Sequence, residues 1–276
     1  MSEIHPCFSR EAGRRHGRMH LPVAPACNIR CNYCDRRFSC VNESRPGVAA
    51  HVLKPAEALV LALRAREKMP WLSVAGIAGP GDPLANPEST LETIRLVRRE
   101  MPDILLCLST NGLALPDYAD DLANLGVSHL TVTINAVDPA IGAKIYRQVQ
   151  GSAGQLEGRR AAEYLLERQL LGLAKISSQK NIVVKVNMVI VPGINLEHAP
   201  EAARKLSGLG VSLMNCIPLA PVKGTPFEDV PEPTKAEMSA IRSEAGKWLQ
   251  QMTHCGRCRA DAVGFLGERR ILGEMG

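Results

Sequence analysis

The sequence predicts an α/β fold in which six strand–helix units form an open, partial barrel. Apolar runs of strand length, several rich in β-branched residues, alternate with helical-period segments of ten or more residues. Connections of that length join parallel strands. Glycine, proline or polar residues follow most of the strands, and in barrels of this kind the loops after the strands form the active site.

The expected elements follow one another at regular intervals. The expected strands are residues 21–26, 72–77, 104–108, 129–135, 182–191 and 211–218. The expected helices are residues 55–68, 88–100, 117–125, 159–177, 197–208 and 235–252. The first helix begins at Pro55, because proline is favoured where the first helical amide has no partner. This pattern divides the chain into an N-terminal arm (1–20), the barrel (21–225) and a C-terminal helix and tail (226–276).

The bulk composition indicates a cytoplasmic protein with one large domain. The chain has 276 residues, of which 45% are hydrophobic and nine are cysteine. Its first twenty residues are charged and lack the apolar core of a signal peptide, and no apolar run reaches the roughly 18–20 residues of a membrane span. Thiols stay reduced in the cytoplasm, so metal binding is favoured over disulfides. The net charge of +5 is modest and spread through the sequence, and the short basic clusters and the aromatic content of 4% argue against a nucleic-acid surface.

Three cysteines lie close together after the first expected strand, at Cys27, Cys31 and Cys34. Their C-x3-C-x2-C spacing lets one short loop bind three irons of a [4Fe–4S] cubane and leaves the fourth iron without a protein ligand. An open iron is typical of a cluster that binds a substrate or cosubstrate. A tetrahedral zinc site would need a fourth ligand from elsewhere in the chain. Buried thiols without metal are disfavoured, because polar residues separate the cysteines.

Six further cysteines and a histidine remain for other centres. The tail carries a second metal-binding pattern, C-x2-C at Cys255 and Cys258, which needs partners from other parts of the chain. Cys216 lies in an apolar strand and is expected to pack there as a small hydrophobic residue. The other potential ligands are Cys7, His20, Cys40 and Cys107. Incomplete ligation would suit clusters that must later leave the protein, because each additional thiolate would have to be displaced.

The cysteine loop resembles the signature of the radical S-adenosylmethionine (SAM) enzymes, including the aromatic Tyr33 before the last cysteine. In that family the open iron chelates the amino and carboxylate groups of SAM. One electron then cleaves SAM to methionine and a 5′-deoxyadenosyl radical. The resemblance implies a partial (β/α)6 TIM-like barrel of the radical SAM type. It also implies a set of SAM contacts, namely Tyr33, Gly79, Pro80, Gly81, Asp82, Ser109, Thr110, Asn111 and Asn135.

Further sequence blocks narrow the resemblance and cover nearly the whole chain. They are similar to the radical SAM enzymes that make the nitrogenase cofactor precursor. The blocks are residues 5–9, 20–25, 42–47, 78–83, 110–112 and 255–262. Longer members of this group carry an additional C-terminal domain that binds the finished precursor. The chain is therefore expected to be the short form, which relies on separate carriers.

The resemblance implies a reaction of lyase or transferase type in which two [4Fe–4S] clusters are fused. One SAM donates a methyl group to a cluster sulfide, and a second SAM yields the radical that abstracts hydrogen from that methyl. The product is an eight-iron cluster with a carbide and an added sulfur. The implied partners are iron–sulfur cluster donors, cofactor carriers or scaffolds of nitrogenase assembly, and an electron donor such as ferredoxin. Neither nucleic acid nor a membrane is an expected partner.

The resemblance also assigns the site residues by position. Cys27, Cys31 and Cys34 match the SAM-binding cluster. We expect Cys7, His20 and Cys107 to hold one precursor cluster, and Cys40, Cys255 and Cys258 to hold the other. The catalytic candidates are Glu43, Arg45 and Cys107.

Some alternatives stay open at this point. Glu43 and Arg45 would tune a cluster or position a proton carrier, with surface ion pairing as the other interpretation. Two other functions also fit the sequence. One is a different radical SAM enzyme that uses auxiliary clusters for methylthiolation or activation, and the other is a non-catalytic iron–sulfur scaffold.

Overall fold

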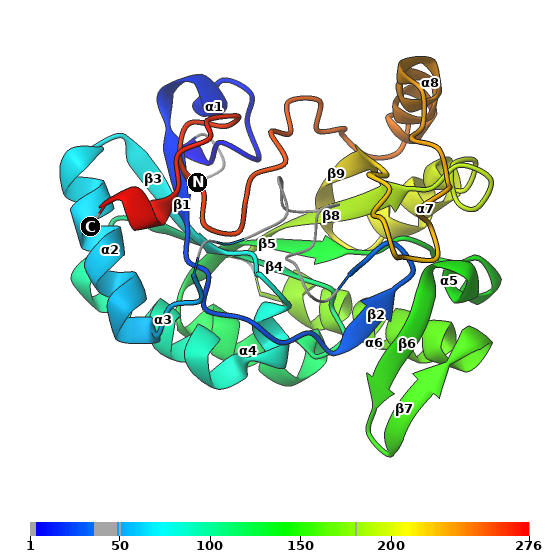
Figure 1. Cartoon of the computed structure of the whole chain (residues 1–276), viewed down its shortest axis with the longest axis horizontal. Helices are drawn as coiled ribbons and strands as arrows, with labels where there is room; N and C mark the ends of the chain where they lie inside the picture. The colour runs from blue at the N-terminus through cyan, green and yellow to red at the C-terminus, as the bar shows by residue number, and fades with distance from the viewer. Residues whose placement is uncertain (1–3, 36–48, 50, 180, 276) are drawn as a thin grey trace.

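The fold is a curled, mostly parallel sheet with helices along its outer face (Figure 1). This computed structural model describes residues 4–35, 49, 51–179 and 181–275. Six parallel strands lie in the order β1-β3-β4-β5-β8-β9, and the antiparallel β10 pairs with β1 at one edge. The strands are β1 (Gly17–His20), β3 (Leu72–Ile77), β4 (Leu105–Thr110), β5 (Val127–Thr133), β8 (Val183–Ile190), β9 (Val211–Pro218) and β10 (Val263–Gly264). The α/β fold with six parallel strands is therefore confirmed.

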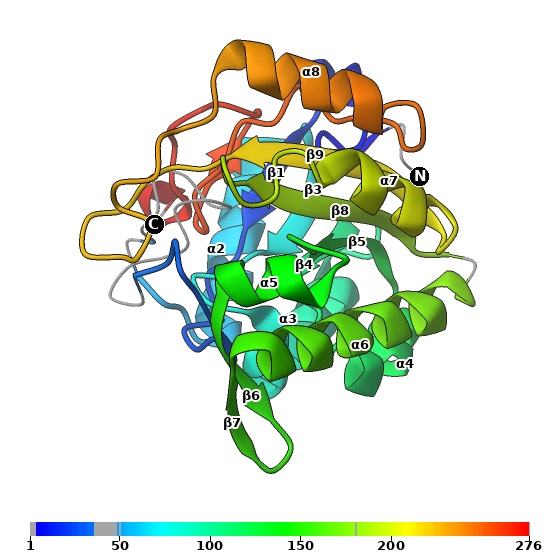
Figure 2. The same ribbon diagram turned by 90° about the vertical axis from the view of Figure 1, so that its right-hand side faces the viewer.

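Helices connect successive strands and cover the outside of the sheet (Figures 1 and 2). They are α2 (Pro55–Lys68), α3 (Pro87–Glu100), α4 (Leu115–Asn124), α6 (Gly158–Ser177), α7 (Ala199–Ser207) and α8 (Lys235–Ala245). Their apolar faces and the strands form one large buried core. All seven residues of β5 are buried, as expected for a strand covered on both faces.

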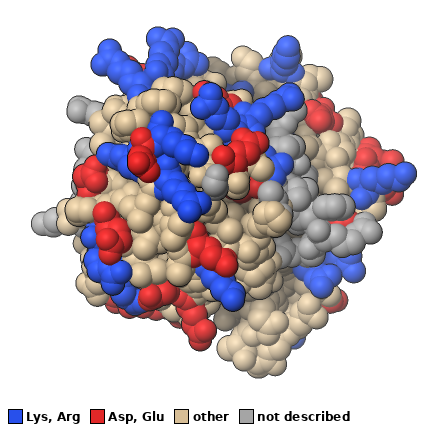
Figure 3. Space-filling view, turned by 60° about the vertical axis from the view of Figure 1, so that its left-hand side comes forward, with Lys and Arg blue, Asp and Glu red and all other residues tan. Residues whose placement is uncertain are grey.

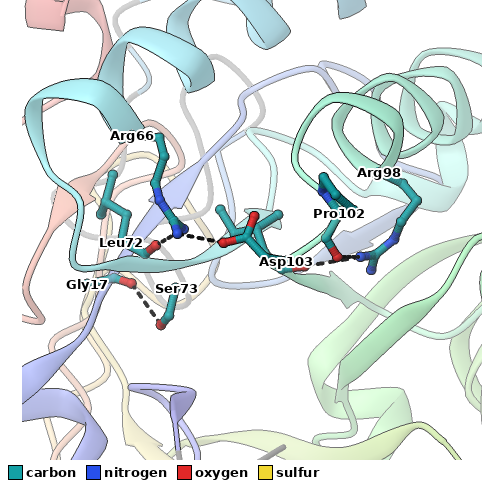
Figure 4. Close-up of polar contacts among 8 residues, drawn as sticks. Gly17, Arg66, Leu72, Ser73, Arg98, Pro102 and Asp103 are labelled. Carbon is teal, nitrogen blue, oxygen red and sulfur yellow. Dashed lines mark hydrogen bonds and ion pairs between the residues drawn. The ribbon is translucent and has the colours of Figure 1, made fainter.

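Polar contacts close the junctions between the first helices and strands (Figure 4). Arg66 on α2 donates to the backbone oxygen of Leu72 and pairs with Asp103 at 2.7 Å. Arg98 on α3 donates to the backbone oxygen of Pro102 at 2.9 Å. These bonds satisfy backbone carbonyls at the start of β3 and just before β4. Each helix is therefore fixed to the start of the strand that follows it.

The N-terminal arm and the C-terminal tail contact each other at one end of the barrel (Figure 1). The N-terminal arm, residues 4–16 with the short helix α1 (Ala12–Arg15), precedes β1. The C-terminal tail, residues 246–275, passes over it and ends in the 3-10 turn η3 (Leu272–Met275). Arg10 donates to Thr253 Oγ1 at 3.0 Å, and a ring nitrogen of His254 bonds to Pro6 O at 3.0 Å. The arm and the tail therefore cover the same part of the barrel.

The structure corrects the first expected strand. The strand is β1, Gly17–His20, and residues 21–26 form an extended loop rather than a strand. Pro22 and Pro25 explain the difference, because proline has no amide hydrogen to donate to a neighbouring strand. The last expected helix also ends early, at Ala245 instead of residue 252. Helix α8 begins with a capping box in which Thr234 and Glu237 bond each other's backbone amides.

A second small sheet was not predicted. It contains β2 (Ile29–Cys31), β6 (Tyr146–Gly151) and β7 (Gly154–Glu157), and the helix α5 (Pro139–Ile145) leads into it. Both pairings in this sheet are antiparallel. The hairpin of β6 and β7 extends from the barrel beside the cysteine loop, which contains β2 (Figure 1).

The surface carries both signs of charge. On the face drawn in Figure 3, Lys and Arg side chains are interspersed with Asp and Glu, and no single-sign patch covers the barrel. None of the described helices is long and apolar enough to cross a membrane.

Candidate functional site

The cysteine loop is joined to the glycine-rich turn that follows β3. Gly81 donates its backbone amide to Ala24 O at 2.6 Å, and Asp82 donates to Ala26 O at 2.8 Å. A Cβ atom at position 81 would lie 2.0 Å from the oxygen of Ala26. Only glycine permits this approach. The glycine turn and the segment before Cys27 (residues 24–26) are therefore held together by hydrogen bonds between their backbones.

The other side of the cysteine loop is held by the hairpin. Ile29 pairs with Val149 and Cys31 with Tyr146, while the amide of Asn32 donates to Ile145 O at 2.8 Å. The loop is thus fixed from two directions, by the turn after β3 and by β6. A rigid backbone is needed if three side chains are to point into one site.

Asp82 ties the turn to the end of β4. Its carboxylate accepts hydrogen bonds from Thr110 Oγ1 at 3.0 Å, from the amide of Asn111 at 2.6 Å and from the amide of Leu84 at 2.9 Å. Burial raises the pKa of this carboxyl group, and the hydrogen bonds oppose that rise. Because its oxygens are occupied by protein donors, Asp82 positions the walls of the site.

These three segments surround one pocket. It holds about 490 Å³ of empty space between the cysteine loop, the turn and the end of β4. Asn111 Nδ2 lies 3.7 Å from Cys27 Sγ and donates to Asn28 Oδ1 at 2.7 Å. Of the predicted site residues, Cys27, Cys31, Cys34, Pro80, Gly81, Asp82, Ser109, Thr110 and Asn111 line this pocket.

The donor set fits a cubane with three protein ligands. Three thiols from one loop, those of Cys27, Cys31 and Cys34, line the pocket. A cubane spreads its ligands over separate irons. The space opposite the thiols, beside a glycine turn and hydroxyl and amide side chains, can accept a small polar ligand.

Two of the predicted SAM contacts, Tyr33 and Asn135, are not among the residues that line the pocket. Asn135 is fully buried, and its Nδ2 donates to Tyr33 OH at 2.8 Å. Its Oδ1 accepts from the amide of Val189 at 2.8 Å. Tyr33 is also buried. These bonds link the cysteine loop to β8, so the two side chains support the loop. The third residue outside the lining is Gly79, which adjoins Pro80.

A second cavity, of about 710 Å³, lies inside the barrel. Five of the predicted ligands line it, although they come from the arm, β1, β4 and the tail. They are Cys7, His20, Cys107, Cys255 and Cys258. Ala78 and Ser109 line both cavities, so the two sites adjoin at the ends of β3 and β4.

Strand register places His20 and Cys107 on either side of a glycine. His20 pairs with Gly76, and Gly76 pairs with Cys107. A Cβ atom at position 76 would lie 3.4 Å from His20 Cδ2 and 3.7 Å from Cys107 Cβ. Across the neighbouring strands β1, β3 and β4, the imidazole of His20 and the thiol of Cys107 therefore have no side chain between them.

The ring of His20 is oriented as in many metal sites. Its Nδ1 lies 2.8 Å from the oxygen of Arg259. When Nδ1 carries the proton and donates to this carbonyl, Nε2 keeps its lone pair for a metal. Burial, with a further contribution from Arg18, lowers the pKa of His20 to about 4. The imidazole is therefore neutral at physiological pH, which is the form that binds metal.

Burial also holds the cavity thiols in their protonated form. It raises the pKa of Cys107 to about 12 and that of Cys7 to about 11, and the neighbouring Cys258 and Cys255 add to the effect at Cys7. Thiolates, not thiols, bind metal. Binding of a metal centre by these thiols would consequently be coupled to release of protons.

Comparison with known proteins agrees with this geometry. Residues 21–206 match the model of the Radical SAM superfamily. The chain belongs to the radical SAM superfamily. The matched residues include the cysteine loop, the glycine turn and strands β3, β4, β5 and β8.

Curated relatives narrow the comparison. The chain is 50% identical over 264 residues to the FeMo cofactor biosynthesis protein NifB of Chlorobaculum tepidum and 49% identical over 270 residues to that of Klebsiella pneumoniae. These alignments cover 96% of this chain but only 62% and 58% of the two relatives. The chain thus spans about three-fifths of the length of these relatives. The predicted resemblance to this group of radical SAM enzymes is confirmed.

Solved structures confirm the fold. A radical SAM methyltransferase from Sphaerobacter thermophilus aligns over 86% of this chain and 64% of its own, with a TM-score of 0.60 at 19% identity. The FeFe-hydrogenase maturase HydG from Carboxydothermus hydrogenoformans aligns over 85% of this chain and 52% of its own, with a TM-score of 0.60 at 17% identity. At these identities the likeness concerns the partial barrel alone.

Several predicted residues lie apart from both cavities or outside the described part of the chain. Cys216 is fully buried in the core and lies 3.4 Å from Gln251 Oε1, in agreement with the packing role expected for it. Cys40, Glu43 and Arg45 fall outside the described residues. Their predicted roles in this radical SAM chain therefore stay predictions.

The sequence analysis missed the polar residues that share the inner cavity with the thiols. Arg18 on β1 and Lys185 on β8 both line it, as do Asn187 and Asn215. A signal was present in the sequence. Lys185 lies among apolar and β-branched residues in an expected strand of the barrel. Burying a single charged side chain there costs free energy unless the charge is paired or serves the function of the site.

Proposed function

We propose that this radical SAM protein joins two [4Fe–4S] clusters, a carbon from SAM and an added sulfur into the eight-iron precursor of the nitrogenase cofactor. One observation carries the proposal. Cys7, His20, Cys107, Cys255 and Cys258 line a single cavity that adjoins the pocket of the cysteine loop. The identity of 46–50% to NifB proteins named for FeMo cofactor biosynthesis supports it.

The pocket of the cysteine loop would contain the resident cofactor. Cys27, Cys31 and Cys34 would hold its [4Fe–4S] cluster, which when bound supplies the electron that cleaves SAM. The glycine turn and the end of β4 form the opposite wall, so they would bind and orient the polar groups of SAM. Asn135 and Tyr33 would keep the loop in place through their hydrogen bond.

The inner cavity would hold the substrate clusters. Cys7, His20 and Cys107 form one ligand group, and Cys255 and Cys258 belong to the other, together with Cys40. Groups of three ligands leave irons free to form new bonds. A cluster held in this way also needs fewer bonds broken when the product leaves.

The shared wall of the two cavities is suited to the transfer of carbon. Ser109 and Ala78 line both spaces, so a group formed beside the cysteine loop would reach the inner cavity without crossing solvent. In the proposed reaction one SAM donates its methyl to a cluster sulfide and leaves as S-adenosylhomocysteine. A second SAM accepts one electron, gives methionine, and its deoxyadenosyl radical takes a hydrogen atom from that methyl to become 5′-deoxyadenosine. Glu43 and Arg45 would tune a cluster or position the carrier of the remaining protons, and Cys107 would take part in the reaction as a ligand of a substrate cluster.

The proposal requires partners of defined chemistry. The substrate clusters would come from an iron–sulfur cluster donor, the electron from a small reductant such as ferredoxin, and the product would pass to a carrier or scaffold protein of nitrogenase assembly. The location would be the cytoplasm, where thiols stay reduced.

The test is the fate of the methyl carbon of SAM. Protein reconstituted without oxygen with iron and sulfide should, with a reductant and methyl-labelled SAM, form S-adenosylhomocysteine and 5′-deoxyadenosine in about equal amounts and retain label in the extracted cluster. Label found only in S-methylated small molecules or peptides would favour another radical SAM reaction. Absence of both nucleoside products in a fully loaded protein would favour a scaffold.

Separate sites make a second test possible. Cys258→Ala should lose about four irons, because one substrate cluster loses a ligand, while cleavage of SAM continues at the cysteine loop. Cys216→Ala is the matched control, since this thiol lies in the core away from both cavities. If Cys258→Ala abolishes cleavage as completely as Cys31→Ala, the division of the ligands into separate sites is wrong.

A further inference from the structure

Two cations, Arg18 and Lys185, line the inner cavity, whereas no Asp or Glu occurs among the described residues of its wall. Arg18 lies on β1 and Lys185 on β8, with β3, β4 and β5 between these two strands in the sheet. An arrangement of this kind creates a positive potential throughout the space between them.

Lys185 has little compensation for its charge within the described structure. Its side chain extends from β8, and the residue is only 6% exposed. The contacts of its ammonium group are Met252 Sδ at 4.0 Å and the ring of Phe8, whose centroid is 5.3 Å away. A thioether is a weak acceptor, and an aromatic face gives a modest attraction.

Arg18 is fixed at one end and unsatisfied at the other. It is 1% exposed, and its Nη1 donates to Gly264 O at 2.6 Å and to Phe265 O at 3.1 Å. Its Nε and Nη2 have no hydrogen-bond partner among the described residues. The two carbonyls orient the guanidinium, and donors on the same group remain available for an occupant of the cavity.

Such charges are costly unless something else neutralises them. Removing an ion from water costs several kcal/mol in a protein even after relaxation, and replacing it with an apolar side chain is often neutral or stabilising. Two buried cations that lack carboxylate partners therefore indicate an occupant that is itself an anion. SAM is a poor candidate, because its sulfonium is positive.

We propose that Arg18 and Lys185 hold the substrate clusters of the inner cavity by charge, as the counter-ions of thiolate-ligated iron–sulfur anions. This inference rests on the function proposed above. The ligand residues supply bonds to individual irons, whereas the two cations act on the whole cluster. They would strengthen its retention at a site with few ligands and favour its reduced form, which carries more negative charge.

The inference also explains how a sparsely ligated cluster stays in the protein until it reacts. Charge attraction has no fixed geometry, so it would act both on separate clusters and on the larger product, in proportion to the negative charge that each carries. Bonds to iron can then exchange while the cluster remains inside. The immobile guanidinium of Arg18 and the flexible ammonium of Lys185 would serve this purpose from β1 and β8.

The test compares Lys185→Met, which keeps the volume and removes the charge, with Lys185→Arg, which keeps the charge. Lys185→Gln serves as a second neutral variant. Lys205→Met is the matched control, because this lysine on α7 is exposed and its contact within the described part of the chain is a hydrogen bond to Val137 O, at 3.3 Å. The proteins are loaded with iron and sulfide without oxygen. The measurements are the rate at which a chelator removes iron from the cavity and the midpoint potential of its clusters by EPR-monitored titration.

We expect Lys185→Met and Lys185→Gln to lose cavity iron at least about tenfold faster than the wild type, because a buried opposite charge is left unpaired. Their cavity clusters should become harder to reduce. Lys185→Arg and Lys205→Met should match the wild type. Thermal unfolding of the metal-free Lys185→Met protein should occur at no lower temperature than in the wild type, since an uncompensated charge has been removed.

The outcomes separate this inference from the proposed function. If the neutral variants retain iron at the wild-type rate and potential while the wild type forms the eight-iron product, the role of charge is wrong and the function stands. If the fully loaded wild type holds only the cluster of the cysteine loop, both are wrong. A lower unfolding temperature of metal-free Lys185→Met would show that Lys185 serves the fold and would also overturn the inference.

Discussion

The buried carboxylate of Asp82 accepts a hydrogen bond of 2.6 Å from the backbone amide of Asn111. Together with the bonds from Thr110 and Leu84, it joins the turn after β3 to the end of β4. Both segments line the pocket of the cysteine loop. The shape of this pocket therefore depends on a side chain whose carboxylate oxygens accept hydrogen bonds from the protein itself.

Asp82→Ala should destabilise the protein by about 2–4 kcal/mol, because it leaves several buried donors without an acceptor. The measurement is urea unfolding of the metal-free protein. Asp117→Ala is the control, since Asp117 is exposed and its carboxylate pairs with Arg168 near the surface. A loss of less than about 0.5 kcal/mol at Asp82, no greater than that expected at a surface position, would contradict the role given to it.

Gly81→Ala should disrupt the contact between the glycine turn and residues 24–26, which precede Cys27. Its new methyl group would collide with Ala26 O, 2.0 Å away, so the backbone must shift where the two cavity walls meet. We expect loss of measurable SAM binding by calorimetry in the reconstituted protein and a lower unfolding temperature. Gly273→Ala, where no atom lies within 4 Å of the added Cβ, should leave both unchanged. Normal SAM binding by Gly81→Ala would show that this contact does not shape the site.

Tyr33 and Asn135 should be coupled energetically. Tyr33→Phe removes one partner of their 2.8 Å hydrogen bond, and Asn135→Ala removes the other, along with the acceptor of the Val189 amide. A double-mutant cycle measured by urea unfolding should give an interaction energy of about 1 kcal/mol. Strict additivity of the two single changes would mean that the bond contributes nothing to holding the cysteine loop.

Cys216 should resist alkylation in the folded, metal-free protein. Burial raises the pKa of this thiol to about 12, so almost no thiolate exists at pH 8, and the core excludes the reagent. Mass spectrometry after treatment with iodoacetamide should find Cys216 unmodified and the partly exposed Cys255 and Cys258 modified. After unfolding in guanidinium all three should react alike. Labelling of Cys216 at the rate of Cys258 in the folded state would place it outside the core.

Much of the barrel could be predicted from local pattern. Helix α2 and strands β3 and β9 have the expected bounds, because the periods of apolar residues in these segments are unambiguous. The first strand was misplaced by several residues, since the apolar run 21–26 contains prolines that cannot complete a ladder of hydrogen bonds. The hairpin of β6 and β7 was missed because its strands alternate only weakly and pair with the cysteine loop, a contact far away in sequence.

The predicted ligands differ in the same way in how far local sequence determines their position. The C-x3-C-x2-C spacing was sufficient to predict the cysteine loop, because all three thiols belong to one turn of chain whose geometry is local. The residue types of Cys7, His20, Cys107, Cys255 and Cys258 could be recognised as well. Their meeting in one cavity was decided by the tertiary structure, in which β10 pairs with β1 and brings the tail beside the arm. The same holds for Arg18 and Lys185, because only the curl of the sheet turns side chains from β1 and β8 toward a common space. Pairing between distant strands depends on packing of the whole core, which no short segment of the sequence specifies.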